Sequence, residues 1–142
     1  MTGYGPIETE RLMLSELTLD DAGLMLAIWN DPAFIRYVGD RGIRTAEDAH
    51  EAMRQGVLRL YEDYGYGPFK VSLKDSGEAI GISGLFRREG LDDPDIGYAT
   101  LPTHCGKGFA YEAACAVVDY AATRLALERL IAIISPDNTA SI

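Results

Sequence analysis

Two glycines separated by one residue stand where a strand-like segment meets a long apolar helix. The strand-like segment covers residues 96–101, and the periodicity predicts a helix from about Gly108 to Leu125. Gly106 and Gly108 lie at the junction, where glycine lets the backbone approach a ligand without an intervening side chain. The first N–H groups of a helix have no partner within the helix, and the positive end of the helix dipole lies there too. The sequence therefore predicts an anion site, of the kind that holds a phosphate, at the start of this helix.

The remaining elements follow from hydrophobic periodicity, capping residues and turn signals. Listed in chain order, we expect a strand at 10–17, a helix from Thr18 to Asn30, a loop or broken helix at 33–44, a helix from Thr45 to Gly65, and strands at 69–74, 79–86 and 95–101. The last three strands would form an antiparallel meander, because an Asp-Ser-Gly turn joins the first two.

The long helix is apolar nearly all round, so we expect both of its flanks to be covered and Cys115 to be buried. Residues 129–134 are β-formers and predict a further strand. A strand, a crossover helix and a strand imply a parallel pair with the helix N-terminus at the carboxyl end of the first strand, where ligands bind in open α/β sheets. The expected fold class is α+β, arranged as a three-layer structure, with a mixed, mostly antiparallel sheet and helices on both faces.

Composition narrows the possible functions. The 142 residues fit a single domain over 1–142, no segment has the length of a membrane span, and a cytoplasmic location follows by default. A net charge of −9 disfavours a nucleic-acid partner and is compatible either with a cationic partner or with ordinary surface solubility. The two cysteines have no metal-site spacing, so no metal is expected. Cys105 adjoins the anion loop, but with only His104 and His50 as potential bases we do not expect it to be a covalent catalyst.

Six short motifs, spread over nearly the whole chain, occur in an order that resembles one known family. In chain order they are Thr9-Glu10-Arg11-Leu12-Met13-Leu14, Asp31-Pro32 with Arg36-Tyr37, Gly77-Glu78-Ala79-Ile80-Gly81 with Gly84-Leu85, Ile96-Gly97-Tyr98, Gly106-Lys107-Gly108-Phe109-Ala110 with Glu112-Ala113, and Pro136-Asp137-Asn138-Thr139-Ala140-Ser141. Together they resemble the GNAT superfamily of N-acetyltransferases, and within it the RimJ/RimL type that acetylates ribosomal proteins and other amino groups.

The chain departs from the family pattern in two places. Cys105 and Thr103 stand where the family prefers an aromatic residue and a Gln or Arg, and Tyr111 replaces a small residue in the helix. The family also continues beyond the Asn-x-x-Ser segment into a helix and two strands that this chain lacks, so the fold is expected to be C-terminally incomplete. Either the sequence is a fragment of a longer protein, or another copy supplies the missing edge by strand exchange or pairing, and in the second case we expect the chain to self-associate as a homo-oligomer through the unfinished sheet edge.

The resemblance implies acetyl-CoA as the acetyl donor and a primary amine as the acceptor, which attacks directly in a ternary complex. Backbone N–H groups of the glycine loop would hold the pyrophosphate, and the pantetheine arm would lie along the strand before it, with a backbone N–H near Ala99 facing the acetyl oxygen. The implied cofactor-binding residues are Tyr98, Ala99, Thr100, Leu101, Cys105, Gly106, Lys107, Gly108, Phe109, Ala110 and Asn138.

The same resemblance suggests catalytic and acceptor-site residues, each with a plainer alternative. Asp95 is the candidate base, although a strand-end carboxylate more often faces solvent, and Glu112 is expected to stabilise the helix start. Ser141 maps to a proposed proton donor, or else to a turn. The candidate acceptor contacts are Trp29, Arg36, Tyr37 and Phe69, although aromatic residues at helical spacing usually belong to the core.

Two rival functions remain open at this point. An incomplete acceptor site would suit a coenzyme A-binding scaffold without catalysis. A nucleotide-binding α/β module is less well supported, because its fingerprint needs a third glycine and a later acidic residue.

Overall fold

An antiparallel sheet forms the centre of the molecule. In the computed structural model, which describes residues 5–87, 93–125, 127 and 130, this sheet has five strands in the order β1-β2-β3-β4-β5. The strands are β1 (Ile7–Glu8), β2 (Leu12–Glu16), β3 (Pro68–Leu73), β4 (Ala79–Phe86) and β5 (Asp95–Thr100). The helices are η1 (Leu19–Asp21), α1 (Ala22–Trp29), α2 (Pro32–Tyr37), α3 (Ala46–Gln55), α4 (Val57–Tyr64), η2 (Pro102–His104) and α5 (Phe109–Thr123). The β3–β4–β5 meander is confirmed, whereas the strand expected at 129–134 and its parallel pairing lie outside the described residues.

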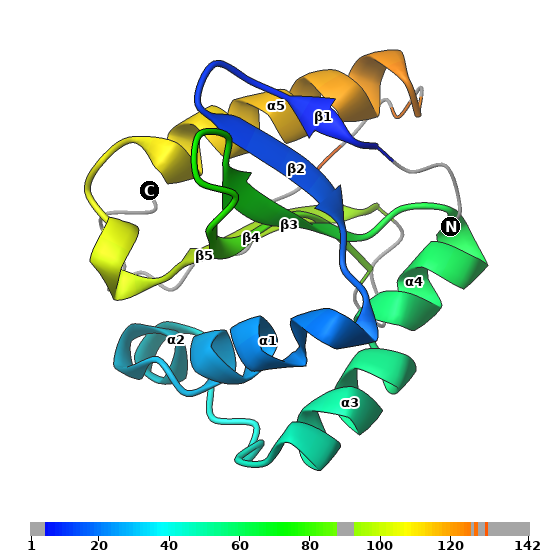
Figure 1. Ribbon diagram of the computed structural model, residues 1–142. Helices are drawn as coiled ribbons and strands as arrows, with labels where there is room; N and C mark the ends of the chain where they lie inside the picture. Colours follow the sequence, from blue (N-terminus) through cyan, green and yellow to red (C-terminus); the bar gives the residue numbers. More distant parts are fainter. Residues whose placement is uncertain (1–4, 88–92, 126, 128–129, 131–142) are drawn as a thin grey trace.

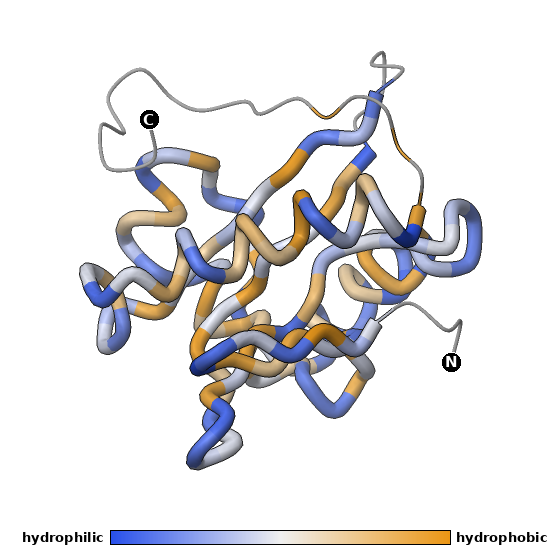
Figure 2. The backbone as a smooth tube through the Cα atoms, turned by 90° about the horizontal axis from the view of Figure 1, so that it is seen from above, coloured by the Kyte–Doolittle hydropathy of each residue, from blue (hydrophilic) through white to orange (hydrophobic). Residues whose placement is uncertain are grey.

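Helices lie on both faces of the sheet, as expected for an α+β fold. Helix α5 runs across one face, where it contacts β2, β4 and β5, and helices α1 to α4 lie on the other side (Figure 1). Along the backbone, hydrophobic residues are frequent toward the middle of the molecule, and several of the outer loops are hydrophilic (Figure 2). Within the described part of the chain, no helix has the length and apolarity that crossing a bilayer requires.

Helix α5 buries one stripe of small residues. Ala113, Val117 and Ala121 are each 1% exposed, and their four-residue spacing places them on one side of the helix against the sheet. The expectation that both flanks are covered is wrong for the described residues, since Tyr111 is 77% exposed. Cys115 is also exposed, because it lies two positions from Ala113 and so points almost opposite to the buried stripe.

The predicted helix starts are confirmed, and one helix is interrupted. Thr18 and Asp21 form a capping box at the expected helix start, with the Asp21 carboxylate accepting a 2.9 Å hydrogen bond from the Thr18 N–H. Thr45 likewise accepts a 3.1 Å hydrogen bond from the Asp48 N–H at the start of α3. The single helix expected to end at Gly65 is wrong, because Gly56 (φ −111°, ψ −98°) leaves the helical region and separates α3 from α4.

The strand register decides which side chains face α5. Phe69 is paired with Ser83, and Ser83 with Tyr98, so these three residues share one face of the sheet. Phe69 meets the ring of Tyr120 in α5 edge-on, with 5.8 Å between ring centroids, and this contact identifies the face. Because successive strand residues alternate, Asp95 lies on the opposite face, toward helices α1 to α4.

Candidate functional site

The glycine loop has the conformation that its sequence demands. Gly106 and Gly108 have φ values of +78° and +81°, in the left-handed region that favours glycine. Gly108 is the N-cap of α5, and no side chain caps this helix start with a hydrogen bond. The helix therefore begins where the sequence predicts. Its first N–H groups have no partner within the helix, and the two glycines beside them carry no side chain that would block a ligand.

The residues before the glycines fold the loop back onto the end of β5. The Cys105 thiol donates to the carbonyls of Thr100 and Leu101, with sulfur–oxygen distances of 3.4 and 3.5 Å. His104 directs its two ring nitrogens elsewhere, with Nδ1 2.8 Å from the Thr103 hydroxyl and Nε2 3.6 Å from a Glu78 carboxylate oxygen. The Cys105 thiol is thus bonded to backbone carbonyls, and no hydrogen bond among the described residues joins it to a ring nitrogen of His104, the base that covalent catalysis would need.

The outer edge of β5 presents backbone groups of alternate residues. Leu101 donates a 2.8 Å hydrogen bond to the carbonyl of Ile80, so the backbone of Leu101 faces β4. In a regular antiparallel ladder the backbone groups of Ala99 also face β4, whereas those of Tyr98 and Thr100 face away from it. Among the described strands, β4 is the neighbour of β5. The backbone N–H and C=O groups of Tyr98 and Thr100 therefore lie at the outer edge of β5. These two residues flank Ala99, near which the N–H facing the acetyl oxygen was expected.

A small cavity lies between the first turn of α5 and the sheet. Its lining residues are Val71, Ile80, Gly81, Ile82, Ser83, Thr100, Phe109, Ala110 and Ala113, and it has room for about one water molecule. The Ser83 hydroxyl is buried and has no hydrogen-bond partner among the described residues. A Cβ on Gly81 would overlap the Ala99 carbonyl oxygen, so glycine here allows β4 and β5 to approach closely beside the loop.

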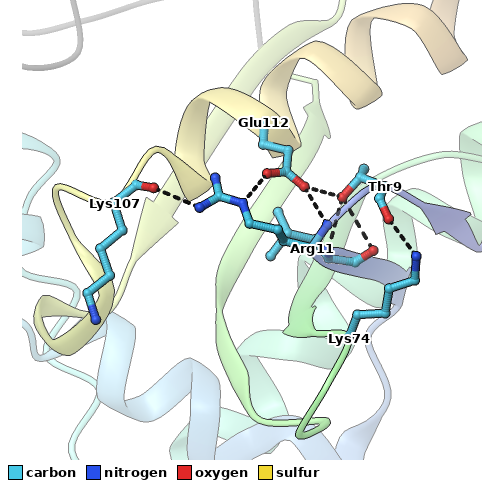
Figure 3. Close-up of polar contacts among 6 residues, drawn as sticks. Thr9, Arg11, Lys74, Lys107 and Glu112 are labelled. Carbon is cyan, nitrogen blue, oxygen red and sulfur yellow. Dashed lines mark hydrogen bonds and ion pairs between the residues drawn. The ribbon is translucent and has the colours of Figure 1, made fainter.

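A cluster of polar contacts ties the segment before β2 to the glycine loop (Figure 3). The Arg11 Nε donates a 2.7 Å hydrogen bond to one Glu112 oxygen, and the other oxygen accepts from the Arg11 N–H at 2.9 Å and the Thr9 hydroxyl at 2.5 Å. The Arg11 guanidinium also donates to the Lys107 carbonyl at 3.1 Å and lies 4.3 Å above the Phe109 ring centroid. Burial of Glu112 acts to raise the pKa of its carboxyl, but the hydrogen bonds from Thr9 and Arg11 outweigh this effect and hold the pKa below its ordinary value.

Sequence reasoning gave Glu112 a role at the helix start but missed Arg11. Glu112 does stabilise this end of α5, although through a partner about one hundred residues earlier in the chain. Both residues belong to motifs that carry the family resemblance, and their opposite charges were the only indication in the sequence that they form an ion pair. Nothing in the spacing indicated that the two motifs meet.

Of the two candidate catalytic residues, Asp95 lies within the described residues and Ser141 does not. Asp95 is 1% exposed at the start of β5, opposite Phe86 in β4, so its alternative interpretation as a solvent-facing carboxylate is wrong. Ser141 lies outside the described residues, as does the candidate cofactor contact Asn138.

The structure does not bring the four candidate acceptor contacts together. Phe69 is fully buried on the α5 face, whereas Trp29 is 4% exposed in α1 on the other side of the sheet. The Arg41 guanidinium lies over the Trp29 ring, 5.0 Å from the ring centroid. Arg36 and Tyr37 lie together at the end of α2, with Arg36 exposed and its guanidinium 4.9 Å from the Tyr37 ring centroid. Trp29 and Phe69 are therefore core residues here, and the accessible pair is Arg36 and Tyr37.

Comparison with known proteins agrees with this arrangement. Residues 11–142 match the family model described as an acetyltransferase (GNAT) domain. An uncharacterized N-acetyltransferase, p20, of Bacillus licheniformis is 33% identical over 135 residues, covering 94% of this chain and 75% of the relative. An uncharacterized N-acetyltransferase, YoaA, of Bacillus subtilis is 32% identical over 136 residues, with 95% and 76% covered.

Solved structures have the same fold. An acetyltransferase from Agrobacterium tumefaciens superposes with a TM-score of 0.82 and 27% identity, covering 98% of this chain and 79% of that one. RimL, a ribosomal-protein alpha-N-acetyltransferase solved with coenzyme A, superposes with a TM-score of 0.77 over 94% of this chain and 76% of its own. At 17% identity RimL supports the fold alone. With the family model spanning nearly the whole chain, the protein belongs to the GNAT family and is an acetyl-CoA-dependent acyltransferase.

Proposed function

We propose that the chain transfers the acetyl group of acetyl-CoA to a primary amine by direct attack in a ternary complex. The observation that carries the proposal is the pair of glycines with positive φ at the start of α5, which no side chain caps, directly after β5, the last strand in the order of the described sheet. Such a junction offers several backbone N–H groups to one anion and so suits the pyrophosphate of coenzyme A.

The residues at this junction fit an extended thioester of coenzyme A. Backbone N–H groups from Gly106 to Ala110 would hold the pyrophosphate, and the exposed Lys107 side chain would add a positive charge beside it. The outward backbone groups of Tyr98 and Thr100 would hold the pantetheine arm in the manner of a neighbouring strand. When bound, acetyl-CoA supplies the activated acetyl group. The protein's part is to orient the donor and stabilise charge at its carbonyl oxygen.

The acceptor would approach from the side of the sheet that carries α1 and α2. Asp95 lies on this face, so its carboxylate is our candidate for receiving the proton of the attacking ammonium group. Arg36 and Tyr37 are the accessible side chains at the end of α2 that would meet the acceptor. Asn138 and Ser141 remain candidates for a cofactor contact and for the proton donor to the departing thiolate.

We propose a protein N-terminus or a small cationic amine as the acceptor. Structural neighbours include acetyltransferases named for ribosomal proteins and for spermidine, so amines of both kinds are used on this fold. The net charge of −9 would favour the approach of a cationic amine over that of an anionic one.

Calorimetry with acetyl-CoA, coenzyme A and ATP, together with thiol release in a panel of amines, tests the proposal. We expect micromolar binding of both coenzyme A forms, no binding of ATP and amine-dependent thiol release. Binding of ATP without coenzyme A would contradict the donor assignment. Coenzyme A binding with no turnover of any amine would instead favour the non-catalytic scaffold.

Asp95→Asn tests the proposed base. We expect a fall in kcat of at least about a hundredfold at neutral pH, with the acetyl-CoA affinity unchanged. Urea unfolding of the variant separates this effect from a loss of folding. A kcat close to that of the wild type would remove Asp95 from the mechanism.

A further inference from the structure

The Arg11 side chain is held in one position from three directions. Its Nε bonds to Glu112 at 2.7 Å, its terminal nitrogen bonds to the Lys107 carbonyl at 3.1 Å, and its plane lies over the Phe109 ring. The neighbouring backbone N–H of Arg11 is fixed by the same carboxylate at 2.9 Å. A forked guanidinium can serve a carboxylate and a carbonyl at once, which a lysine ammonium on a flexible stem does less well.

The carbonyl that Arg11 holds belongs to the peptide between the two positive-φ glycines of the loop. A trans peptide unit is planar, so its C=O and N–H point in opposite directions. When the Lys107 carbonyl points to Arg11, the N–H of Gly108 must point away from Arg11. Figure 3 shows the Lys107 carbonyl directed at Arg11 while its side chain extends elsewhere.

Without Arg11, this peptide unit could reverse its direction. Rotation of the unit changes ψ of Lys107 and φ of Gly108, and glycine populates both signs of φ. In a reversed peptide unit, the Lys107 carbonyl oxygen would take the place of the Gly108 N–H that donates to the anion. One peptide orientation attracts a phosphate and the other repels it.

We infer that Arg11, held by Glu112, is a positioning residue that keeps the Gly108 N–H directed away from Arg11, on the side of the loop where we place the phosphate. The inference rests on the proposed function, because it assumes that the loop holds the pyrophosphate of coenzyme A. Glu112 then assists the binding of an anion although it is itself negative. Its fixing of Arg11 outweighs its repulsion of the phosphate.

Two substitutions separate this role from a simple effect of charge. In Glu112→Gln a negative charge near the loop disappears, so Coulomb attraction alone would tighten coenzyme A binding. The positioning role predicts the opposite, a weakening of about threefold, because a neutral amide holds Arg11 less firmly. Arg11→Lys keeps the positive charge but loses the fork, so affinity should fall nearly as far as in Arg11→Ala, by about tenfold.

The experiment measures coenzyme A affinity by calorimetry in Arg11→Ala, Arg11→Lys and Glu112→Gln, with thermal unfolding of each. Arg59→Ala is the control, because Arg59 forms an exposed ion pair with Asp63 within α4. We expect the three loop variants to bind coenzyme A more weakly and the control to bind as the wild type does. Full affinity in Arg11→Lys, or tighter binding in Glu112→Gln, would overturn the inference.

A second measurement compares two donors in the same variants. Acetyl-pantetheine lacks the pyrophosphate, so kcat/KM for this donor should change less than twofold in Arg11→Ala, while kcat/KM for acetyl-CoA falls about tenfold. Equal losses with both donors would mean a general structural defect and would refute the positioning role. If the wild type itself bound no coenzyme A, the proposed function would fail. If wild type and Arg11→Ala bound it equally, only the present inference would fail.

Discussion

Replacing Gly106 by alanine separates the backbone strain of the glycine loop from its contact with a ligand. A Cβ at Gly106 meets no atom within 4 Å, so the free protein has space for it. The cost lies in the backbone, because φ is +78° and an L-residue in the left-handed region loses about 1–2 kcal/mol. Alanine also restricts the unfolded chain, which returns about 0.4–1 kcal/mol. The net loss of stability should be about 1 kcal/mol, or about 4 °C in Tm.

Gly65 provides a matched control for this variant. It has φ +73°, it likewise has no atom within 4 Å of an added Cβ, and it ends α4, away from the loop. Gly65→Ala should therefore lose a similar amount of stability in urea unfolding. Any additional loss of acetyl-CoA affinity in Gly106→Ala must come from contact between the new methyl group and the bound molecule, since no protein atom occupies that space.

Calorimetry with acetyl-CoA gives the deciding comparison. We expect Gly106→Ala to bind at least about tenfold more weakly, because the methyl group keeps the phosphate from approaching the backbone, and Gly65→Ala to bind as the wild type does. Wild-type affinity in Gly106→Ala would mean that the phosphate does not approach the backbone at Gly106. Equal loss of affinity in both variants would also contradict this close approach, since the effect would then follow from stability alone.

Three further predictions concern single side chains. Tyr61→Phe should lose about 2 kcal/mol in urea unfolding, because the Tyr61 hydroxyl accepts from the Leu17 N–H and donates to the Pro68 carbonyl in the buried core, and a loss below about 0.5 kcal/mol would contradict this. Ser83→Ala should leave stability unchanged or slightly raised, because the buried hydroxyl has no partner among the described residues, and a loss above about 1 kcal/mol would indicate a bonded internal water. The pKa of Glu112 is lowered in the folded protein, so its ion pair with Arg11 stabilises the fold fully above the ordinary pKa of 4.5. This stabilisation is lost as the pH falls through the folded-state pKa. The difference in unfolding free energy between wild type and Glu112→Gln should therefore stay constant near neutrality and shrink below about pH 4.5.

Local chemistry made much of the fold predictable. The helix starts at Thr18 and Thr45 follow from side-chain oxygens that bond nearby N–H groups, and these lie within three residues along the chain. The start of α5 follows from glycines that adopt positive φ. Each of these features depends on a few consecutive residues, which is why the sequence alone indicates them.

Features that depend on distant contacts were not predictable in the same way. Alternation places Phe69 on one face of its strand, but only the register and the position of Tyr120 decide that this face meets α5. Cys115 lies in a helix that is apolar nearly all round, so its composition could not tell which side the sheet would cover. The Arg11–Glu112 ion pair joins two motifs at opposite ends of the described chain, and a single sequence carries no information about that pairing.

The most direct test of acetyl transfer at the glycine loop is to measure free thiol and acetylated amine in the same reaction. With acetyl-CoA and a primary amine, we expect free thiol and acetylated amine to appear in a one-to-one ratio, and mass spectrometry to find the protein itself unmodified. Thiol release without an acetylated amine, or an acetyl group retained on Cys105, would contradict direct transfer at the glycine-loop site.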